Sequence, residues 1–171
     1  LGRILSPTNN NKPLVSFISS ISYDHMALLG NSLEEIAWEK AGIIKEGVPI
    51  VSYPQQREAR FVIERVAAEK NSKLIMVKED SGQLLEIEDT YQVVKFSTEN
   101  SNYTISLALL GKVQIYNCAV VIHTVEALMA LGVVISKEAI YEGLKKVTWK
   151  GRMELMRTKP YVLLDGAHNI D

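Results

Sequence analysis

The chain has 171 residues, of which 47% are hydrophobic and 23% are charged, a composition typical of a globular protein. This length is enough for one ordinary domain with its own core, or for one domain and part of another. Basic and acidic residues nearly balance, at 19 and 20, so we expect no nucleic-acid partner and no polybasic patch that binds membranes.

The first segment, residues 1–12, is polar and carries Gly2, Pro7 and three successive asparagines, which predicts a loop. The chain starts with Leu1 rather than Met and stops at Asp171 inside a predicted turn. We therefore expect it to be part of a longer protein.

Residues 13–23 form a nearly continuous apolar run with small hydroxyl residues, which is typical of a strand buried on both faces of a parallel sheet. Asp24 and His25 follow this predicted strand. A carboxylate and an imidazole at a strand end can bind a divalent ion or move a proton. They can equally form a turn or a cap.

The next stretch predicts a helix that ends at Gly42, with Asn31 or Ser32 as the N-cap and Glu34 or Glu35 closing a capping box. These glutamates, together with Glu39, are expected to lie on a solvated helix face.

Lys40 is an unusual residue of this helix, because helical spacing places it on the face that should turn to the core. Three apolar residues share that face, Leu33, Ile36 and Ala37. A cation there must reach water, pair with a carboxylate, lose its proton or be chemically altered. Lys40 is therefore either a solvent-reaching or ion-paired lysine, or a member of one site with Asp24 and His25.

Residues 48–53 and 73–77 predict two further buried strands, joined by an amphipathic helix over residues 54–71. The β-α-β-α-β order predicts an α/β fold with a doubly wound parallel sheet and right-handed crossovers. Ligands of such sheets bind beyond the carboxyl ends of the strands, which is where Asp24 and His25 are expected.

The pattern then changes to short alternating runs, which predict an antiparallel β meander with strands at residues 84–87, 91–96 and 103–110. Two helices follow over residues 113–131 and 137–146, the second capped by Ser136. No apolar run is expected to be long enough to span a membrane.

Several residues in these elements have a structural interpretation. Cys118 lies in an apolar helical pattern and is interpreted as a core residue, and His123 as a hydrogen-bonded core or boundary residue. Trp38 and Trp149 are expected to be packing residues.

The last stretch predicts two strands, at residues 152–157 and 161–164. The loop that follows, residues 165–169, reads Asp-Gly-Ala-His-Asn. Its Gly166 permits close approach of backbone to a ligand, and Asp165 and His168 add polar groups at a strand end.

Three absences from the sequence bear on function and location. No Gly-x-x-x-x-Gly-Lys-Ser/Thr loop occurs, so the main phosphate cradle of any nucleotide site is of another kind or lies outside this chain. A single cysteine excludes a disulfide framework, and the N-terminus lacks a signal-peptide pattern. These two observations predict a cytoplasmic protein.

Six motifs occur in order along the chain, at residues 19–25, 28–37, 39–45, 114–117, 151–154 and 163–169. Together they resemble the folylpolyglutamate synthases and bifunctional dihydrofolate synthases of the Mur ligase family, across essentially the whole chain. The first three motifs form one block, residues 19–45, that is long and specific. The three later motifs are short.

The resemblance implies an ATP-dependent ligase that activates a folate carboxylate as an acyl phosphate and joins it to the amine of glutamate. The folate would be tetrahydrofolate or dihydropteroate, and the full-length protein a monomer. Residues 1–148 would form the C-terminal part of a central, P-loop-type ATPase domain, and residues 149–171 the start of a Rossmann-like C-terminal domain. The chain alone is expected to be inactive, because the family's P-loop precedes the position of Leu1.

The resemblance also implies a metal site. The histidine matched by His25 is a magnesium ligand in that family, and the lysine matched by Lys40 is carbamylated. A desolvated lysine favours its neutral amine, which can add carbon dioxide, and the resulting carboxylate suits a hard cation such as Mg²⁺. Asp24 would belong to the same catalytic group.

A nucleotide site is implied as well, because the residues matched by Asn117, Arg152 and Asp165 contact ATP in that family. Arginine is suited to phosphate charge. His168 would lie near these residues and is included among the catalytic candidates.

Two alternatives remain open. Residues 1–9 lack an aspartate that the family carries before the first buried strand, and Val113 replaces a family histidine. The chain is then either a Mur-type amide ligase for a non-folate acid, or a non-catalytic family member that binds a nucleotide or a partner protein.

Overall fold

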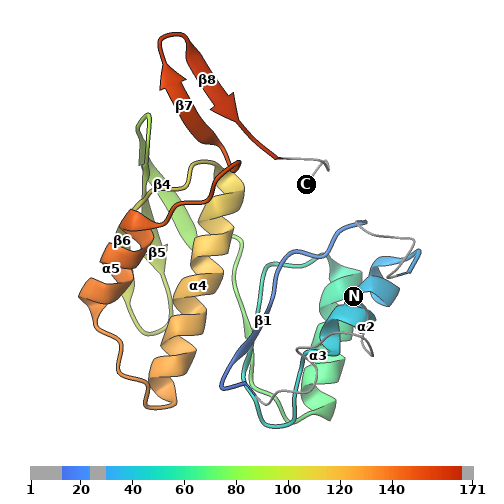
Figure 1. The fold of residues 1–171 in the computed structure, drawn as a ribbon. Helices are drawn as coiled ribbons and strands as arrows, with labels where there is room; N and C mark the ends of the chain where they lie inside the picture. The colour runs from blue at the N-terminus through green and yellow to red at the C-terminus, as the bar shows by residue number, and fades with distance from the viewer. Residues whose placement is uncertain (1–12, 24–29, 167–171) are drawn as a thin grey trace. The chain divides into compact units, whose positions relative to one another are not determined.

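The structure is a computed structural model that describes residues 13–23 and 30–166. Two compact units make up the chain, as traced in Figure 1. The first comprises Leu1–Lys78 and His123–Val133, and the second comprises Glu79–Ile122 and Val134–Asp171.

A three-stranded parallel sheet forms the centre of the first unit, in the order β1 (Ser16–Ile18), β2 (Ile50–Ser52) and β3 (Leu74–Met76). Helix α2 (Leu33–Ala41) connects β1 to β2, and α3 (Arg57–Glu69) connects β2 to β3. The predicted β-α-β-α-β order and parallel pairing are therefore confirmed, although each strand is shorter than its apolar run.

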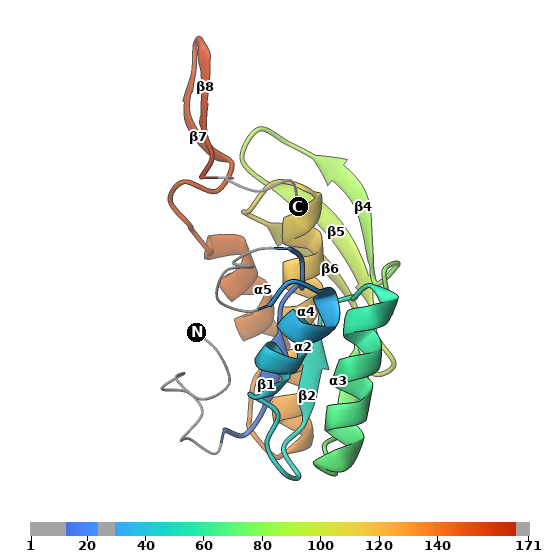
Figure 2. The same ribbon diagram turned by 90° about the vertical axis from the view of Figure 1, so that its right-hand side faces the viewer.

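Both connecting helices pack on the same face of this sheet, side by side (Figures 1 and 2). Consecutive parallel strands joined by right-handed crossovers require this arrangement. The core between the layers is made of fully buried aliphatic side chains from both helices and from the strands, including Ile18, Ile36, Ile50 and Ile63. Each such side chain contributes roughly 1.5–3 kcal/mol of burial free energy.

The start of α2 is fixed by local hydrogen bonds. The Ser32 hydroxyl accepts a hydrogen bond from the Glu35 N–H at 3.2 Å, and the Glu35 carboxylate accepts one from the Asn31 N–H at 2.7 Å. The Ser32 bond satisfies one of the N–H groups that a helix start leaves unpaired. The predicted N-cap is confirmed as Ser32, and the Glu35 carboxylate reaches back to the N–H of Asn31, one residue before the cap, instead of to the N–H of Ser32.

The second unit contains the predicted antiparallel meander, formed by β4 (Gly82–Ile87), β5 (Gln92–Ser97) and β6 (Asn102–Leu107). Burial alternates along β5 and β6, so that Val94 pairs with Ile105 and Phe96 with Tyr103 on the covered face. This alternation is what the sequence pattern predicts for a sheet with one face in the core.

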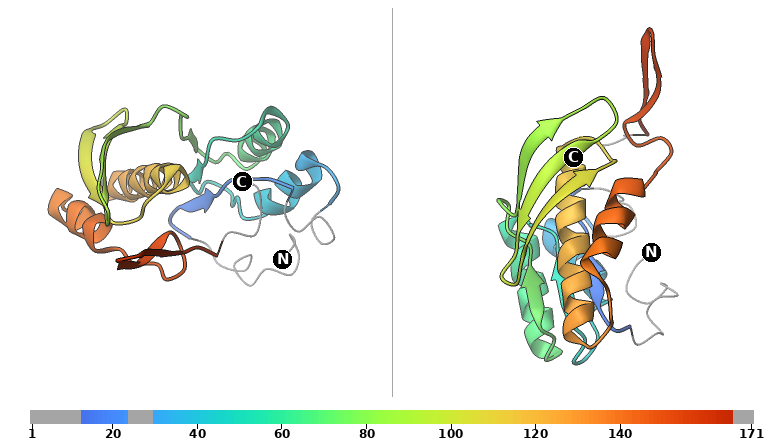
Figure 3. Two further views of the ribbon diagram at one scale, coloured as in Figure 1. Left: turned by 90° about the horizontal axis from the view of Figure 1, so that it is seen from above. Right: turned by 90° about the vertical axis from the view of Figure 1, so that its left-hand side faces the viewer.

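Helices α4 (Lys112–Ala130) and α5 (Lys137–Lys146) follow the meander. Helix α5 and the first half of α4 cover one face of the sheet (Figure 3). The Ser136 hydroxyl accepts a hydrogen bond from the Ala139 N–H at 3.1 Å, which confirms the predicted cap. A separate antiparallel hairpin, β7 (Glu154–Thr158) and β8 (Tyr161–Leu164), confirms the last two predicted strands.

Helix α4 corrects one expectation, that no apolar run is long enough to span a membrane. Its 19 residues are long and apolar enough to cross a membrane, by length and composition alone. One such helix is weak evidence, because core helices have the same properties. Three residues of α4, Ile115, Cys118 and Ile122, are at most 7% exposed and belong to the core.

Gly82 provides a test of the packing of α4 on the sheet. A Cβ atom there would overlap the Ile115 side chain and lie 2.9 Å from Phe96 Cε1, so we expect Gly82→Ala to destabilise the chain by roughly 1–3 kcal/mol. Urea unfolding followed by circular dichroism measures the change. The matched control is Gly143→Ala in α5, where a Cβ meets nothing within 4 Å and should stabilise by up to about 1 kcal/mol. Equal effects of the two substitutions would contradict this packing.

Cys118 provides a test of the core. Burial raises the pKa of its thiol from 9.0 to about 12. The unfolded chain therefore loses this proton first, and stability conferred by the neutral thiol is complete below pH 9.0 and is lost as pH rises toward about 12. We expect the free energy of unfolding to fall more steeply with pH in this window for the unsubstituted chain than for Cys118→Ala. Parallel curves would show that the thiol is not buried.

Candidate functional site

The carboxyl ends of β1 and β2 form the candidate site of the first unit. Strand β1 ends at Ile18 and β2 at Ser52, and the two strands are adjacent and parallel. The chain segments that leave these ends therefore emerge at one edge of the sheet, which is the usual ligand-binding edge of open α/β sheets.

Lys40 reaches this edge from α2. Leu33, Ile36 and Ala37 are buried at 4%, 0% and 0% exposure, which confirms that their shared face turns to the core. Lys40 is half-buried on the same face, and its Nζ atom donates a hydrogen bond to the Ser20 carbonyl oxygen at 3.3 Å. Helical side chains lean toward the helix N-terminus, so the ammonium group is directed to the exit of β1.

Gln55 is a residue of this edge that the sequence did not indicate. It lies three residues beyond the end of β2, and its Nε2 atom donates to the Ser19 carbonyl oxygen at 2.9 Å. Its Oε1 atom accepts a hydrogen bond from the Ile21 N–H at 3.0 Å. The only sequence signal for Gln55 is its position just after a predicted buried strand.

Three predicted site residues lie outside the described residues, namely Asp24, His25 and His168. Within residues 13–23 and 30–166, no group of three His, Cys, Asp or Glu residues could hold a metal ion. The predicted magnesium site of His25 and Lys40 therefore stays a prediction. Lys40 is the member whose position is described.

Two predicted nucleotide contacts, Arg152 and Asp165, lie at the open end of the β7–β8 hairpin in the second unit. The Asp165 carboxylate accepts a hydrogen bond from the Met153 N–H at 2.8 Å. The Gly166 N–H donates to the Gly151 carbonyl at 2.7 Å, and the Gly151 N–H donates to the Glu154 carboxylate at 2.7 Å. These bonds hold the segment with Arg152 against the segment with Asp165.

Asn117, the third predicted nucleotide contact, lies in the second turn of α4. Its side chain is exposed and donates a hydrogen bond to Gln114 Oε1 at 3.2 Å. A Cβ atom placed on Gly111, directly before α4, would lie 4.0 Å from Met153 Cγ. The start of α4 therefore adjoins the end of the hairpin that carries Arg152 and Asp165.

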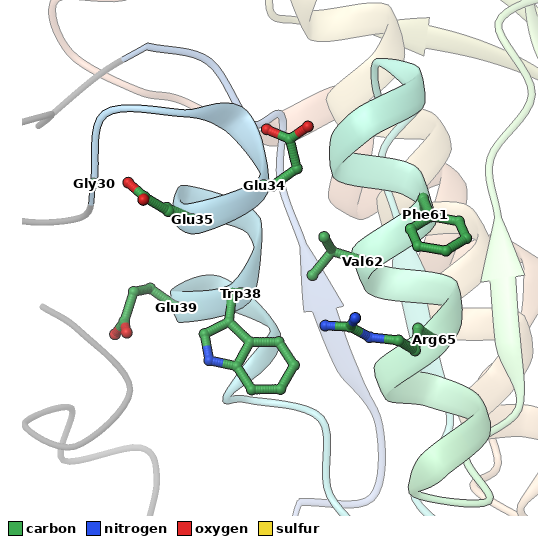
Figure 4. Close-up of a pocket in the computed structure, with 8 residues that line it drawn as sticks. All are labelled: Gly30, Glu34, Glu35, Trp38, Glu39, Phe61, Val62 and Arg65. Carbon is green, nitrogen blue, oxygen red and sulfur yellow. The ribbon is translucent and has the colours of Figure 1, made fainter.

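A shallow pocket with a volume of about 560 Å³ lies between α2 and α3 in the first unit. Figure 4 shows Trp38 and Arg65 facing each other across it, with the guanidinium carbon 5.1 Å from the ring centroid. Glu35 and Glu39 point away from α3 in the same view. A binding pocket normally has convergent polar groups, so we do not assign a catalytic role to this pocket.

Other residues interpreted from the sequence have mixed outcomes. Cys118 is a buried core residue, as predicted, and His123 is half-buried, consistent with a boundary position. Trp38 packs against the core of the first unit. The expectation for Trp149 was wrong, because its side chain is 64% exposed.

Comparison with known proteins gives concordant matches. Residues 4–125 match the Mur ligase middle domain family. The chain is 43% identical over 173 residues to the dihydrofolate synthase/folylpolyglutamate synthase of Bacillus subtilis (strain 168), covering 99% of this chain and 40% of that protein. It is 35% identical over 184 residues to the folylpolyglutamate synthase of Arabidopsis thaliana, covering 99% and 30%.

Solved structures give the same result. The folylpolyglutamate synthase of Thermotoga maritima superposes with a TM-score of 0.82 at 34% identity, covering 98% of this chain and 38% of that one. The apo form of the L. casei FPGS has a TM-score of 0.88 at 28% identity, covering 94% and 40%. An FPGS complex with AMPPCP and folate has a TM-score of 0.86 at 28% identity, covering 92% and 39%.

The chain spans 30–40% of the length of the two relatives named above. The family match covers well over half of the chain. The parallel sheet, the antiparallel sheet and the connecting helices of the chain match those of the solved structures. The chain therefore belongs to the Mur ligase middle domain family and is homologous to the folylpolyglutamate and dihydrofolate synthases, which are ligases.

Proposed function

We propose that this chain is part of an ATP-dependent ligase that adds glutamate to a folate. The observation that carries the proposal is the position of Lys40, half-buried on the core face of α2 with its amine at the exit of β1. The 43% identity to a dihydrofolate synthase/folylpolyglutamate synthase supports the substrate class. The substrates would be ATP, glutamate, and tetrahydrofolate or dihydropteroate.

The proposed reaction has two steps. The folate carboxylate attacks the γ-phosphoryl group of ATP, giving an acyl phosphate and ADP. The glutamate amine then attacks the acyl carbon, forming the amide and releasing phosphate. The site must mainly position the reactants and stabilise charge on the transferred phosphoryl group.

A magnesium ion would be held by His25 and by Lys40 as its carbamate. The neutral lysine amine forms a bond to the carbon of carbon dioxide and loses one proton, which gives an anionic oxygen ligand. The position of Lys40 fits this assignment, because the amine lies at the ligand-binding edge of the sheet. The bound ion would neutralise charge on the phosphates.

The nucleotide would contact Asn117, Arg152 and Asp165. The short distance between the start of α4 and the end of the β7–β8 hairpin supports this grouping. Asp24 and His168 remain proposed members of the catalytic group.

The proposal extends to domain organisation. We infer that the sheet of β1 to β3 is part of a larger, doubly wound P-loop-type ATPase sheet, and that residues 1–148 are the C-terminal part of that domain. Residues 149–171 would begin a Rossmann-like domain. The separate pairing of β7 with β8 supports this boundary. We further propose a cytoplasmic, monomeric protein, and the single buried cysteine Cys118 supports the location.

A chimera tests the proposal. The corresponding segment of the B. subtilis relative is replaced by this chain, and ADP release is measured with and without glutamate and folate. We expect glutamate-dependent turnover by the chimera and none by the isolated chain, which has no P-loop motif among its 171 residues. Appreciable turnover by the isolated chain would refute the placement of the phosphate cradle.

The control is a second chimera with the corresponding segment of the T. maritima folylpolyglutamate synthase. Should that control turn over while our chimera only binds AMPPCP, the chain is a non-catalytic family member. Turnover with another carboxylic acid but not with folates would instead identify a non-folate Mur-type ligase.

Lys40→Arg in the active chimera tests the proposed ligand. Arginine keeps the charge and can still donate to the Ser20 carbonyl, but it stays protonated and forms no carbamate. We expect kcat to fall by at least about 100-fold, since even residues that only support a metal ligand cost 10–100-fold when removed. The control is Lys45→Arg, whose parent Nζ atom donates to the Gly42 carbonyl at 3.5 Å. Retention of most activity by Lys40→Arg would remove the carbamate from the mechanism.

A further inference from the structure

The backbone just after β1 is held by side chains rather than by another strand. Three consecutive residues each present one polar group to a side chain. The Ser19 carbonyl accepts from Gln55 Nε2 at 2.9 Å, the Ser20 carbonyl accepts from Lys40 Nζ at 3.3 Å, and the Ile21 N–H donates to Gln55 Oε1 at 3.0 Å. Gln55 therefore contacts the peptide units on both sides of Ser20, through the Ser19 carbonyl and the Ile21 N–H.

A primary amide is suited to this double contact, because one planar group carries both a donor and an acceptor. Gln55 thereby continues the pairing between β1 and β2 past the last strand residues, where the Tyr53 N–H still donates to the Ile18 carbonyl at 2.9 Å. A carboxylate could accept from Ile21 but could not donate to Ser19.

The amide of Gln55 is itself oriented by β2. Its Nε2 atom also donates to the Ser52 hydroxyl oxygen at 3.3 Å. The Ser52 side chain is fully buried and its hydroxyl donates to the Tyr53 carbonyl at 3.0 Å. The contact therefore links the exit of β1 rigidly to the end of β2.

We propose that Gln55 is a positioning residue for Lys40: by clamping Ser19 and Ile21, it presents the Ser20 carbonyl to the lysine nitrogen. This inference rests on the proposed function. The carbonyl can accept from the amine and, after carbon dioxide adds and one proton leaves, from the N–H that the carbamate retains. One contact therefore holds the nitrogen before and after the modification.

The experiment uses the active chimera and its Gln55→Ala and Gln55→Glu variants. Carbamate on Lys40 is detected by ¹³C NMR after equilibration with ¹³C-bicarbonate, and kcat is measured against bicarbonate concentration. We expect both variants to show about threefold to tenfold weaker carbamate formation at limiting bicarbonate, the size expected when the hydrogen bond between the Lys40 nitrogen and the Ser20 carbonyl is lost. Their kcat should fall in parallel and recover as bicarbonate is raised.

The matched control is Gln56→Ala. Gln56 is the adjacent residue, is exposed, and makes no side-chain cap to α3, so its variant should keep the carbamate signal and kcat of the unsubstituted chimera. Thermal unfolding of all variants separates folding from positioning.

The outcomes separate this inference from the proposed function. An unsubstituted chimera without a carbamate signal refutes both. A normal carbamate signal in the unsubstituted chimera and in both Gln55 variants refutes the positioning role of Gln55 and leaves the proposed function standing. A loss of kcat that bicarbonate does not restore, with or without a lowered melting temperature, indicates a merely structural role and also refutes it.

Discussion

The candidate site depends on how the chain leaves β1. Beyond Ile18 the backbone of Ser19 to Ile21 no longer follows the strand ladder. Ile21 is only 4% exposed, so its N–H requires a partner within the protein, because unpaired backbone groups near a core are costly. Gln55, from the loop between β2 and α3, supplies that partner, and it also contacts the exposed Ser19 carbonyl, while Lys40 of α2 contacts the exposed Ser20 carbonyl. The lysine amine is thus part of the hydrogen bonding at the exit of β1.

Packing of α2 determines where Lys40 can reach. Leu33, Ile36 and Ala37 are almost completely buried against the sheet, which fixes the rotation of the helix about its axis. The Ser32 cap fixes where the helix begins, and hence the position of each residue along the helix axis. Both constraints together bring the side chain of Lys40 to the carboxyl end of β1, so a cation lies where burial alone would favour an apolar residue.

These constraints explain what the sequence could predict. Helical spacing and capping are local signals, so the core face of α2, the Ser136 cap and the β meander follow directly from the sequence pattern. The role of Gln55 could not be predicted, because its partners Ser19 and Ile21 lie 36 and 34 residues earlier in the chain. A single amide side chain also belongs to no periodic sequence pattern from which its contacts could be predicted. Residue type gave one wrong prediction. Trp149 was expected to pack because it is aromatic, but an aromatic side chain is not necessarily buried.

A second glutamine performs a comparable role in the second unit. Gln92 at the start of β5 is only 1% exposed, and its Nε2 atom donates to the Leu109 and Gly111 carbonyls at 2.7 and 3.1 Å. These two hydrogen bonds hold the turn from which α4 starts, and so help to set the position of Asn117 along the axis of that helix. Within the described residues the Oε1 atom of Gln92 has no hydrogen-bond partner, and an unsatisfied buried acceptor costs about 1–3 kcal/mol. Gln92 therefore gives the turn before α4 two hydrogen bonds and leaves one acceptor unpaired within the described residues.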